Sequence, residues 1–298
     1  MNIKILGATG FIGKNLLKHI PNTQGISLRD QHWQKNVGGD VWINLVGKAH
    51  DHKGQAKEQD FYYANVELTQ QIFEEFLKSE TKLLVHISSI AAVEEFESAK
   101  ALMEDDKNSP FSIYGKLKWA AEKWLLEQKL PEDKKLVILR PPMVHGEGDK
   151  GSLGLLYGLI SKGIPYPLAS FDNQRSFISI DNFCFFITKI IEQYKNLESG
   201  IYHISDDEVV STKQIIEIIE KVEDKKTPKL SLPKFLVIAL AKFGDIIPIP
   251  LNTKRLKKMT GNLTVSNQKI KSALGIEKLP YTAEEGLIKT IKSFQNKK

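Results

Sequence analysis

Three glycines spaced three residues apart are the feature that most constrains how this chain can fold. Gly7, Gly10 and Gly13 come directly after the apolar run 3–6 and open a segment with helical periodicity that starts at Phe11. Glycine at the first position permits a tight turn, at the second it lets the backbone approach a phosphate closely, and at the third it lets the helix pack against the strand. The free N–H groups and the positive dipole end at the start of such a helix attract an anion.

This placement at a strand-to-helix junction predicts a dinucleotide-binding unit rather than an ordinary glycine-rich loop. The residues expected to contact the cofactor are Gly7, Thr9, Gly10, Phe11, Ile12 and Gly13. Two residues after the second apolar run bear on the choice of cofactor. Asp30 could hold the ribose 2′-hydroxyl of NAD, whereas Arg29 would tolerate the 2′-phosphate of NADP. Both NAD and NADP therefore stay open, and Arg29, which comes first, favours NADP slightly.

Short apolar runs alternate with longer helical patterns through the first half of the chain. The runs predicted to be strands are 3–6, 26–28, 41–46, 83–87 and 136–139, and helical periodicity starts near Phe11, Phe61 and Ile113. This alternation predicts an α/β fold with a Rossmann-like doubly wound parallel sheet in residues 1–145. Only residues 30–39 separate the second and third runs, so this crossover is expected to be a short or irregular helix.

The pattern changes after Pro141. A glycine-rich stretch at 146–154 is followed by a strand-like segment near Phe177 and by helical patterns at 181–194, 211–222, 233–243 and 284–294. We expect residues 146–298 to form mainly a smaller C-terminal α/β lobe that binds substrate, with some later segments returning to the first domain. Small ligands usually bind in the cleft between two such lobes.

Composition narrows the class of protein. Of the 298 residues 41% are hydrophobic and 26% are charged, which is ordinary for a soluble globular protein. The single cysteine, Cys184, lies in an apolar run, so we expect a buried thiol and a cytoplasmic location. The formal net charge is +6, but the lysines are scattered, and nucleic acid is not an expected partner. The start of the chain does not resemble a secretion signal, and the apolar segment 233–243 is too short for a membrane span.

A second pattern indicates proton transfer. Tyr114 and Lys118 are four residues apart on a predicted helix, so their side chains share a face. A nearby ammonium group and an oxidised nicotinamide would lower the pKa of the tyrosine and make it a general acid–base group. Ser89, just after the run 83–87, is the expected hydroxyl partner of the reacting oxygen, with Ser88 as the alternative. His86, inside that run, is interpreted as a buried core residue.

Together these motifs resemble the extended short-chain dehydrogenase/reductase family, and within it the NAD-dependent epimerase/dehydratase group that acts on nucleotide sugars. The likeness also rests on the segments 44–47, 64–66, 139–146 and 175–182. It implies that Tyr114 is the acid–base residue, that Lys118 binds the nicotinamide ribose and tunes Tyr114, and that Ser89 binds the reacting oxygen of the substrate. Arg175 matches an arginine that binds the substrate diphosphate. The further cofactor contacts implied are Val46, Gly47, Asn65, Ser88, Pro141 and Val144.

The resemblance also narrows the reaction. Sugar-nucleotide dehydratases carry an Asp-Glu pair directly after the catalytic hydroxyl, where this chain has Ile90 and Ala91, and Glu94 and Glu95 come too late in the chain to match. Dehydration is therefore not expected, and no metal site is expected. A 4-epimerase acting on UDP-glucose or a UDP-N-acetylhexosamine and a 4-ketoreductase both remain, in the synthesis of sugars for surface polysaccharides.

Three further interpretations concern partners and alternatives. A homodimer formed through the helices at 61–77 and 114–126 is expected by analogy with the family. The alternative function is an NAD(P)-binding regulatory or sensing protein without turnover, although relatives of that kind typically lack the tyrosine or the lysine. The basic stretch 254–258, close after the apolar region 232–251, could face anionic lipid, but a solvated helix face is the favoured interpretation.

Overall fold

The computed structural model describes residues 1–30, 32–49, 57–149, 151–166, 168, 171–228, 232–247 and 252–295, apart from the side chain of Arg255. Parallel strands form a six-stranded central sheet in the spatial order β2-β1-β3-β4-β5-β8. Their bounds are β1 Ile3–Leu6, β2 Thr23–Ile26, β3 Val41–Asn44, β4 Leu83–Ile87, β5 Lys135–Arg140 and β8 Gly200–His203. This architecture confirms the predicted Rossmann-like α/β fold.

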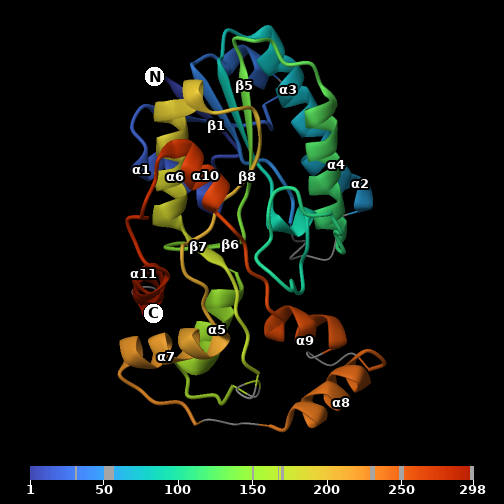
Figure 1. The fold of residues 1–298 in the computed structure, drawn as a ribbon, viewed down its shortest axis with the longest axis vertical. Coiled ribbons are helices and arrows are strands. Elements are labelled where there is room, and N and C mark those ends of the chain that lie inside the picture. Colours follow the sequence, from blue (N-terminus) through green and yellow to red (C-terminus); the bar gives the residue numbers. More distant parts are fainter. Residues whose placement is uncertain are drawn as a thin grey trace.

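Helices cover both faces of the sheet (Figure 1). The helices of one face are α1 (Phe11–His19), α6 (Ile180–Gln193) and α10 (Gln268–Leu274), and those of the other are α3 (Leu68–Lys78) and α4 (Ile113–Glu127). Successive side chains of a strand point to opposite faces. Val41 and Ile43 therefore lie in the core beneath α1 and α6, while Trp42 packs against Phe76 of α3. Burial on both faces explains why these strands read as continuous apolar runs.

The second strand differs from its prediction. We expected it at 26–28, but β2 begins at Thr23 and ends at Ile26, and residues 27–30 form a turn. β2 lies at the edge of the sheet and buries only Ile26, so its other positions can be polar. A search for apolar runs therefore predicts the wrong bounds for this strand. β3 likewise ends at Asn44, two residues before the predicted end. The connection between the two strands holds only the 3₁₀ turn η1 (Trp33–Asn36), in line with the short crossover expected.

Segments from beyond residue 145 help to build the sheet domain. β8 pairs in parallel with β5, and α6 buries Phe183 and Phe186 against the sheet. Cys184 lies in the same core, where burial raises the pKa of its thiol to about 12. The thiol is therefore protonated and buried in packing, as expected.

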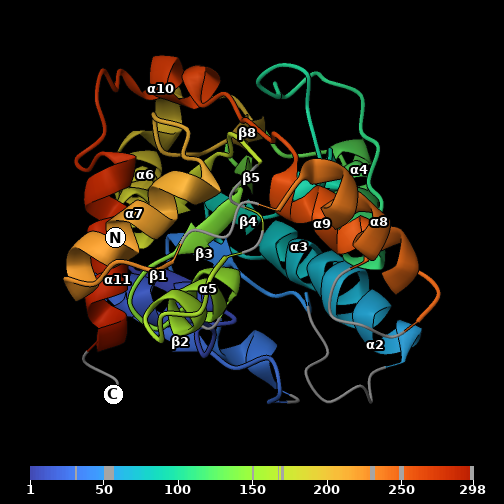
Figure 2. The ribbon, with the colours of Figure 1, turned by 90° about the horizontal axis from the view of Figure 1, so that it is seen from below.

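The rest of the C-terminal half forms a second lobe below the sheet (Figure 1). Its elements are β6 (Met143–His145), α5 (Ser152–Ile160), β7 (Phe177–Ser179), α7 (Thr212–Glu223), α8 (Lys234–Gly244), α9 (Thr253–Thr260) and α11 (Ala283–Gln295). β6 and β7 pair in parallel as a separate two-stranded sheet. Tyr157, Ile219 and Leu287 belong to the lobe's own apolar core. Seen from below, α5, α7 and α11 lie on one side and α8 and α9 on the other (Figure 2).

Within the described residues, no helix is long and apolar enough to cross a membrane. The longest, α4, has 15 residues and carries charged side chains along its length.

Candidate active site

The glycine loop lies between β1 and α1, and its geometry explains each glycine. Gly7 has a φ of +88°, a conformation that side chains rarely adopt, and a Cβ there would lie 3.2 Å from backbone atoms of Leu45 and Val46. A Cβ on Gly13 would lie 2.6 Å from the Cα of Ala8, so this helix turn packs directly on the loop. The loop therefore cannot accept larger residues at either position.

The N-terminus of α1 is open to a ligand. Gly10 occupies the N-cap position and provides no side-chain cap, and both Thr9 and Gly10 are exposed. The N–H groups of the first turn are consequently free to bind an anion, and the helix dipole favours a negative charge there. Phe11 and Ile12 are half-buried and pack against the core of the sheet domain. This geometry fits the pyrophosphate of a dinucleotide.

The second group of predicted residues meets at the carboxyl end of β4. Ser89 follows this strand and caps the 3₁₀ turn η3 (Ile90–Ala92), whose Ala91 N–H donates to its Oγ at 3.2 Å. α4 starts nearby because Ser112 caps it, accepting a hydrogen bond from the Gly115 N–H at 3.0 Å. A Cβ on Gly115 would lie 2.3 Å from the Ala91 carbonyl oxygen. This close contact is what brings the start of α4 against η3.

The pKa of Tyr114 is raised to about 12, chiefly by burial; the neighbouring Ser89 hydroxyl acts to lower it, and the charges of Glu95 and Glu122 raise it further. Our sequence-based expectation that Lys118 lowers this pKa is not met in the protein alone, because desolvation of the phenolate outweighs the neighbouring groups. In this state Tyr114 is a protonated phenol.

Lys118 lies one turn after Tyr114 on α4 and is buried, with 2% of the residue exposed. Its Nζ donates to the carbonyl oxygens of Ile87 at 3.0 Å and Val46 at 3.3 Å. Burial lowers the pKa of Lys118 to about 8, and the charge of Glu122 acts in the opposite direction. The ammonium group thus ties the ends of β3 and β4 together and keeps one N–H beyond these two bonds.

The predicted residues after β3 line the same region. A Cβ on Gly47 would lie 2.9 Å from both the Lys118 Nζ and the Asn65 Oδ1. Asn65 is fully buried in the π-helical turn η2 (Tyr63–Glu67), which follows α2 (Glu58–Tyr62). It accepts from the Lys48 N–H at 3.2 Å and donates to the Lys48 carbonyl at 3.1 Å. In this structure Asn65 therefore fixes the loop after β3.

Arg29 and Asp30, the pair weighed for cofactor choice, are both exposed in the turn after β2. The Asp30 carboxylate accepts from the His32 N–H at 2.9 Å and from the Asn36 Nδ2 at 3.4 Å. The Asp30 carboxylate is thus engaged within the turn that leads into η1.

The remaining predicted residues lie where the two lobes join. The Pro141 carbonyl oxygen accepts from the Ile90 N–H at 2.9 Å, and Val144 lies in β6. Arg175 lies farther along, before β7, where its Nη1 donates to the carbonyl oxygens of Phe96 at 3.2 Å and Gly261 at 3.0 Å. Burial lowers the pKa of Arg175 to about 10, so the guanidinium remains charged at neutral pH.

Sequence reasoning missed a buried charge network behind the site. Arg140 and Glu122 are each 1% exposed, and the guanidinium forms three hydrogen bonds of 2.7–3.1 Å with the carboxylate. The hydroxyl of Ser88, a residue predicted to contact the cofactor, donates to Glu122. Arg140 belongs to the segment 139–146 that carries the family resemblance, and Glu122 lies one helical turn after Lys118 on the same buried face of α4. These two positions are the sequence signals that could have indicated a buried ion pair. His86 is fully buried and shares a 3.0 Å contact with Asn44, as expected of a core histidine.

Glu95 is a second residue that sequence spacing had set aside. Its carboxylate is largely buried and accepts from the Ser112 N–H at 2.7 Å, at the start of the helix that carries Tyr114. It is thus held as a positioning group at the helix start. No cluster of His, Cys, Asp or Glu within the described part of the chain has the arrangement of a metal site.

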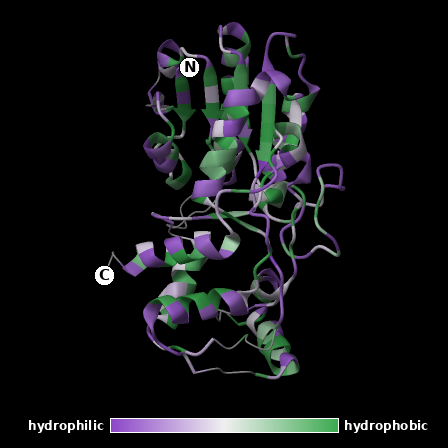
Figure 3. Ribbon diagram, turned by 60° about the vertical axis from the view of Figure 1, so that its left-hand side comes forward, coloured by the Kyte–Doolittle hydropathy of each residue, from purple (hydrophilic) through white to green (hydrophobic). Residues whose placement is uncertain are grey.

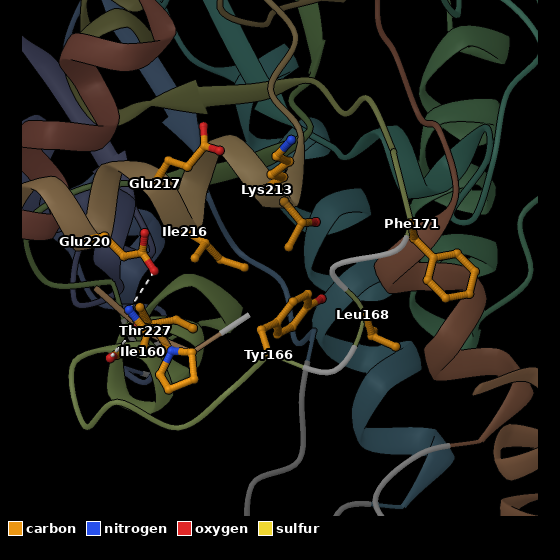
Figure 4. Close-up of a pocket in the computed structure, with 11 residues that line it drawn as sticks. Ile160, Tyr166, Leu168, Phe171, Lys213, Ile216, Glu217, Glu220 and Thr227 are labelled. Carbon is orange, nitrogen blue, oxygen red and sulfur yellow. Dashed lines mark hydrogen bonds between the residues drawn. The ribbon is translucent and has the colours of Figure 1, made fainter. Parts of the chain in front are cut away.

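A cavity of about 220 Å³ lies in the second lobe, between the end of α5 and α7 (Figure 4). Figure 4 shows Tyr166 and Ile216 facing this space from opposite sides, with Lys213 and Glu217 along α7. None of the predicted site residues lines the cavity.

The fold, the glycine loop and the Ser89–Tyr114–Lys118 arrangement define a class of nicotinamide-dependent enzymes. Residues 3–205 match the NAD dependent epimerase/dehydratase family, and the chain belongs to that family.

Curated relatives resemble nearly the whole chain. The UDP-glucose 4-epimerase of Vibrio cholerae is 28% identical over 98% of this chain and 95% of its own length. The N-acetyl-α-D-glucosaminyl-diphospho-ditrans,octacis-undecaprenol 4-epimerase of Escherichia coli O157:H7 is 26% identical over 97% and 94%.

Solved structures confirm the fold at lower identity. The UDP-glucuronic acid 4-epimerase of Bacillus cereus in complex with NAD has a TM-score of 0.77 and 19% identity, covering 99% of both chains. The protein RMD of Pseudomonas aeruginosa complexed with NADPH has a TM-score of 0.75 and 14% identity, covering 99% of this chain and 100% of its own.

Proposed function

We propose that the protein is an NAD(P)-dependent 4-epimerase of a sugar carried on a diphosphate. The observation that carries the proposal is the grouping of Ser89, Tyr114 and the buried Lys118 after the carboxyl end of β4, together with the uncapped N-terminus of α1 after the glycine loop. Both full-length curated relatives are named as 4-epimerases, which supports reaction at the same carbon.

The roles of the residues follow from their chemistry. The glycine loop and the N-terminus of α1 would hold the cofactor pyrophosphate, and Lys118 would offer its remaining N–H to the ribose. When bound, the oxidised nicotinamide would supply an acceptor for the C4 hydride, which it would return to the opposite face, and a positive charge that favours the phenolate. Tyr114 removes the proton from the C4 hydroxyl and later returns it, while Ser89 holds the oxygen in line. The planar, positively charged guanidinium of Arg175 binds the diphosphate.

Epimerisation is favoured over dehydration because the carboxylates near Tyr114 are already bound in the protein. Glu95 is held by Ser112, and Glu122 is held by Arg140. Neither is available to protonate a departing hydroxyl. Reduction of a 4-keto sugar uses the same residues, and the fate of the cofactor separates the two reactions. An epimerase keeps its cofactor through each turnover, so denatured protein should release NAD(P) in proportion to the number of sites.

The substrate is tested directly with a panel of sugars. UDP-glucose, UDP-N-acetylglucosamine and polyprenyl-diphosphate-linked N-acetylglucosamine are each incubated with the protein, and C4 inversion is followed by NMR. Tyr114→Phe should lower turnover by roughly 10²–10⁴-fold, the range for a general acid–base group. Tyr281→Phe, in an exposed tyrosine outside the site, is the control and should keep full turnover. Full turnover by Tyr114→Phe would refute the assignment.

Cofactor choice is a separate proposal. We infer a preference for NADP from the exposed Arg29, because the Asp30 carboxylate already accepts two hydrogen bonds within the turn. Arg29→Ala should then weaken NADP binding and leave NAD binding unchanged. Equal effects on both cofactors would contradict the preference.

Assembly and location complete the proposal. We infer a homodimer through α4 and the neighbouring α2 and η2, where Trp119, Leu126, Tyr62 and Tyr63 are exposed. Light scattering should give twice the 33.7 kDa chain mass, and Trp119→Glu should give the monomer.

Cofactor supply and the buried, reduced Cys184 suit the cytoplasm, and an activated sugar suits surface-polysaccharide synthesis.

A further inference from the structure

Helix α8 exposes an apolar face that no other described part of the chain covers. Of its residues only Val237 and Ala241, one turn apart, are buried. The exposed large apolar side chains of the helix and the turn after it are Phe235, Leu236, Ile238, Leu240, Phe243, Ile246 and Ile247. We call these seven residues the α8 surface. Phe235 is 69% exposed and Ile246 is 84% exposed, far beyond a scattered apolar side chain.

A helix of the same lobe shows what an ordinary solvated face looks like. α7 also buries one stripe, with Ile215, Ile218 and Ile219 in the core. Its exposed positions carry polar side chains, namely Lys213, Gln214, Glu217 and Lys221. α8 has a similar buried stripe, but its exposed positions carry mostly apolar side chains. The exposed face of α8 is therefore not that of an ordinary solvated helix.

The segment around the α8 surface is mainly positively charged. Residues 232–260 contain six Lys or Arg and one Asp, a net of five positive charges in a chain whose formal total is +6. The described lysines of this segment are all exposed, and they are Lys234, Lys242, Lys254, Lys257 and Lys258. Asp245, the one acid, hydrogen-bonds Thr253 at the start of α9. An apolar face flanked by lysines complements an anionic lipid surface.

The position of α8 suits contact with an extended surface. It lies at the end of the second lobe farthest from the sheet (Figure 1), where Figure 3 shows a mostly hydrophobic ribbon. α9 packs against α8. Lys254 lies 4.5 Å from the ring centre of Phe111, just before α4, and the Gly261 carbonyl after α9 accepts from Arg175.

We propose that α8 lies on an anionic lipid bilayer, with the α8 surface in the interfacial region and the lysines of α8 and α9 among the lipid headgroups. The helix has 11 residues, enough to lie in the interface and too few to cross the bilayer. The proposal goes beyond the C4 reaction and does not depend on it. It would bring the diphosphate-binding side of the lobe close to a membrane.

Vesicle flotation tests the proposal with the full-length protein. Wild type should float with vesicles of phosphatidylcholine and phosphatidylglycerol, and markedly less with phosphatidylcholine alone. Phe235→Ser/Ile246→Ser should lower the partition coefficient by roughly tenfold or more, because each buried apolar side chain contributes to insertion. Leu17→Ser, in an exposed leucine of α1 in the other domain, is the matched control and should float like wild type.

A charge pair provides a second, independent comparison. Lys257→Gln/Lys258→Gln should lower partitioning by roughly tenfold, and added salt should reduce the difference from wild type. The control is Lys129→Gln/Lys195→Gln, two exposed lysines that precede β5 and β8 at the opposite end of the sheet. Turnover of a soluble UDP-sugar should be unchanged in Phe235→Ser/Ile246→Ser, so loss of docking and loss of catalysis are read separately.

Two results would overturn the proposal. The first is wild type that stays at the bottom of the gradient with anionic vesicles. The second is a fall in molar mass on Phe235→Ser/Ile246→Ser measured by light scattering, because that result identifies a second copy of the chain as the partner of the α8 surface.

Discussion

Replacing Arg140 with methionine should destabilise the protein more than any surface substitution. The guanidinium forms three hydrogen bonds with Glu122, and both side chains are 1% exposed. Methionine fills much of the space but leaves the carboxylate without its cation. Ser88 remains as its only described hydrogen-bond donor.

The size of the effect follows from the burial of the pair. Removing one partner of a buried ion pair costs about 3–5 kcal/mol, because an uncompensated charge stays in a low-dielectric interior. Total stabilities are about 5–15 kcal/mol, so a large part of the folding free energy would be lost. For a chain of this length roughly 2 °C is expected per kcal/mol, which gives a fall in Tm of about 6–10 °C.

Urea unfolding followed by circular dichroism measures this loss. A double variant, Glu122→Leu/Arg140→Met, removes both charges and should recover most of the stability, apart from about 1 kcal/mol for the lost acceptor of Ser88. Lys123→Met breaks the exposed 3.9 Å pair with Glu127 and should change stability by less than about 1 kcal/mol. If the double variant were as unstable as Arg140→Met, the loss would reflect packing, and the reasoning from buried charge would be refuted.

Three further changes have worked outcomes. Burial lowers the pKa of Lys118 to about 8, so the buried cation destabilises the fold below pH 8, and this destabilisation disappears as the pH rises to about 10.5. In urea unfolding, the free energy of unfolding of wild type should therefore rise by about 3 kcal/mol relative to Lys118→Met between pH 7 and 10.5. Burial raises the pKa of Asp206 to about 7, so the neutral carboxyl stabilises the fold at low pH, and this stabilisation is lost as the pH rises through 7. Asp206→Asn should therefore remove a decrease of about 4 kcal/mol in the free energy of unfolding between pH 4 and 7, measured by urea unfolding. Gly115→Ala forces a Cβ against the Ala91 carbonyl, costs about 1–3 kcal/mol, and should lower turnover more than binding of cofactor, measured by kcat and by cofactor titration.

Much of the fold could be predicted because local patterns and the tertiary structure agree. The buried strands β3, β4 and β5 have apolar residues on both faces, and their runs identify them almost to the residue. β2 could not be placed in this way, since an edge strand of polar residues carries no such signal. β8 escaped prediction as a sheet strand because its place depends on pairing with β5, which is distant in sequence.

The candidate site divides in the same manner. Tyr114 and Lys118 are one helical turn apart, so their neighbourhood is a local property of α4. Ser88 shows the limit of local reasoning: it is adjacent to Ser89, yet its hydroxyl donates to Glu122 on another element. Which of two neighbouring serines meets Tyr114 depends on how η3 packs against the helix.

The sequence by itself determined the phosphate loop, the acid–base pair and the parallel α/β architecture, because these depend on residues a few positions apart and on regular periodicity. The tertiary structure decided the pKa values of Tyr114 and Lys118, the buried Arg140–Glu122 pair and the exposed face of α8. Desolvation and charge pairing depend on which distant segments surround a group. An apolar helix reads the same in sequence whether another part of the chain covers it or not.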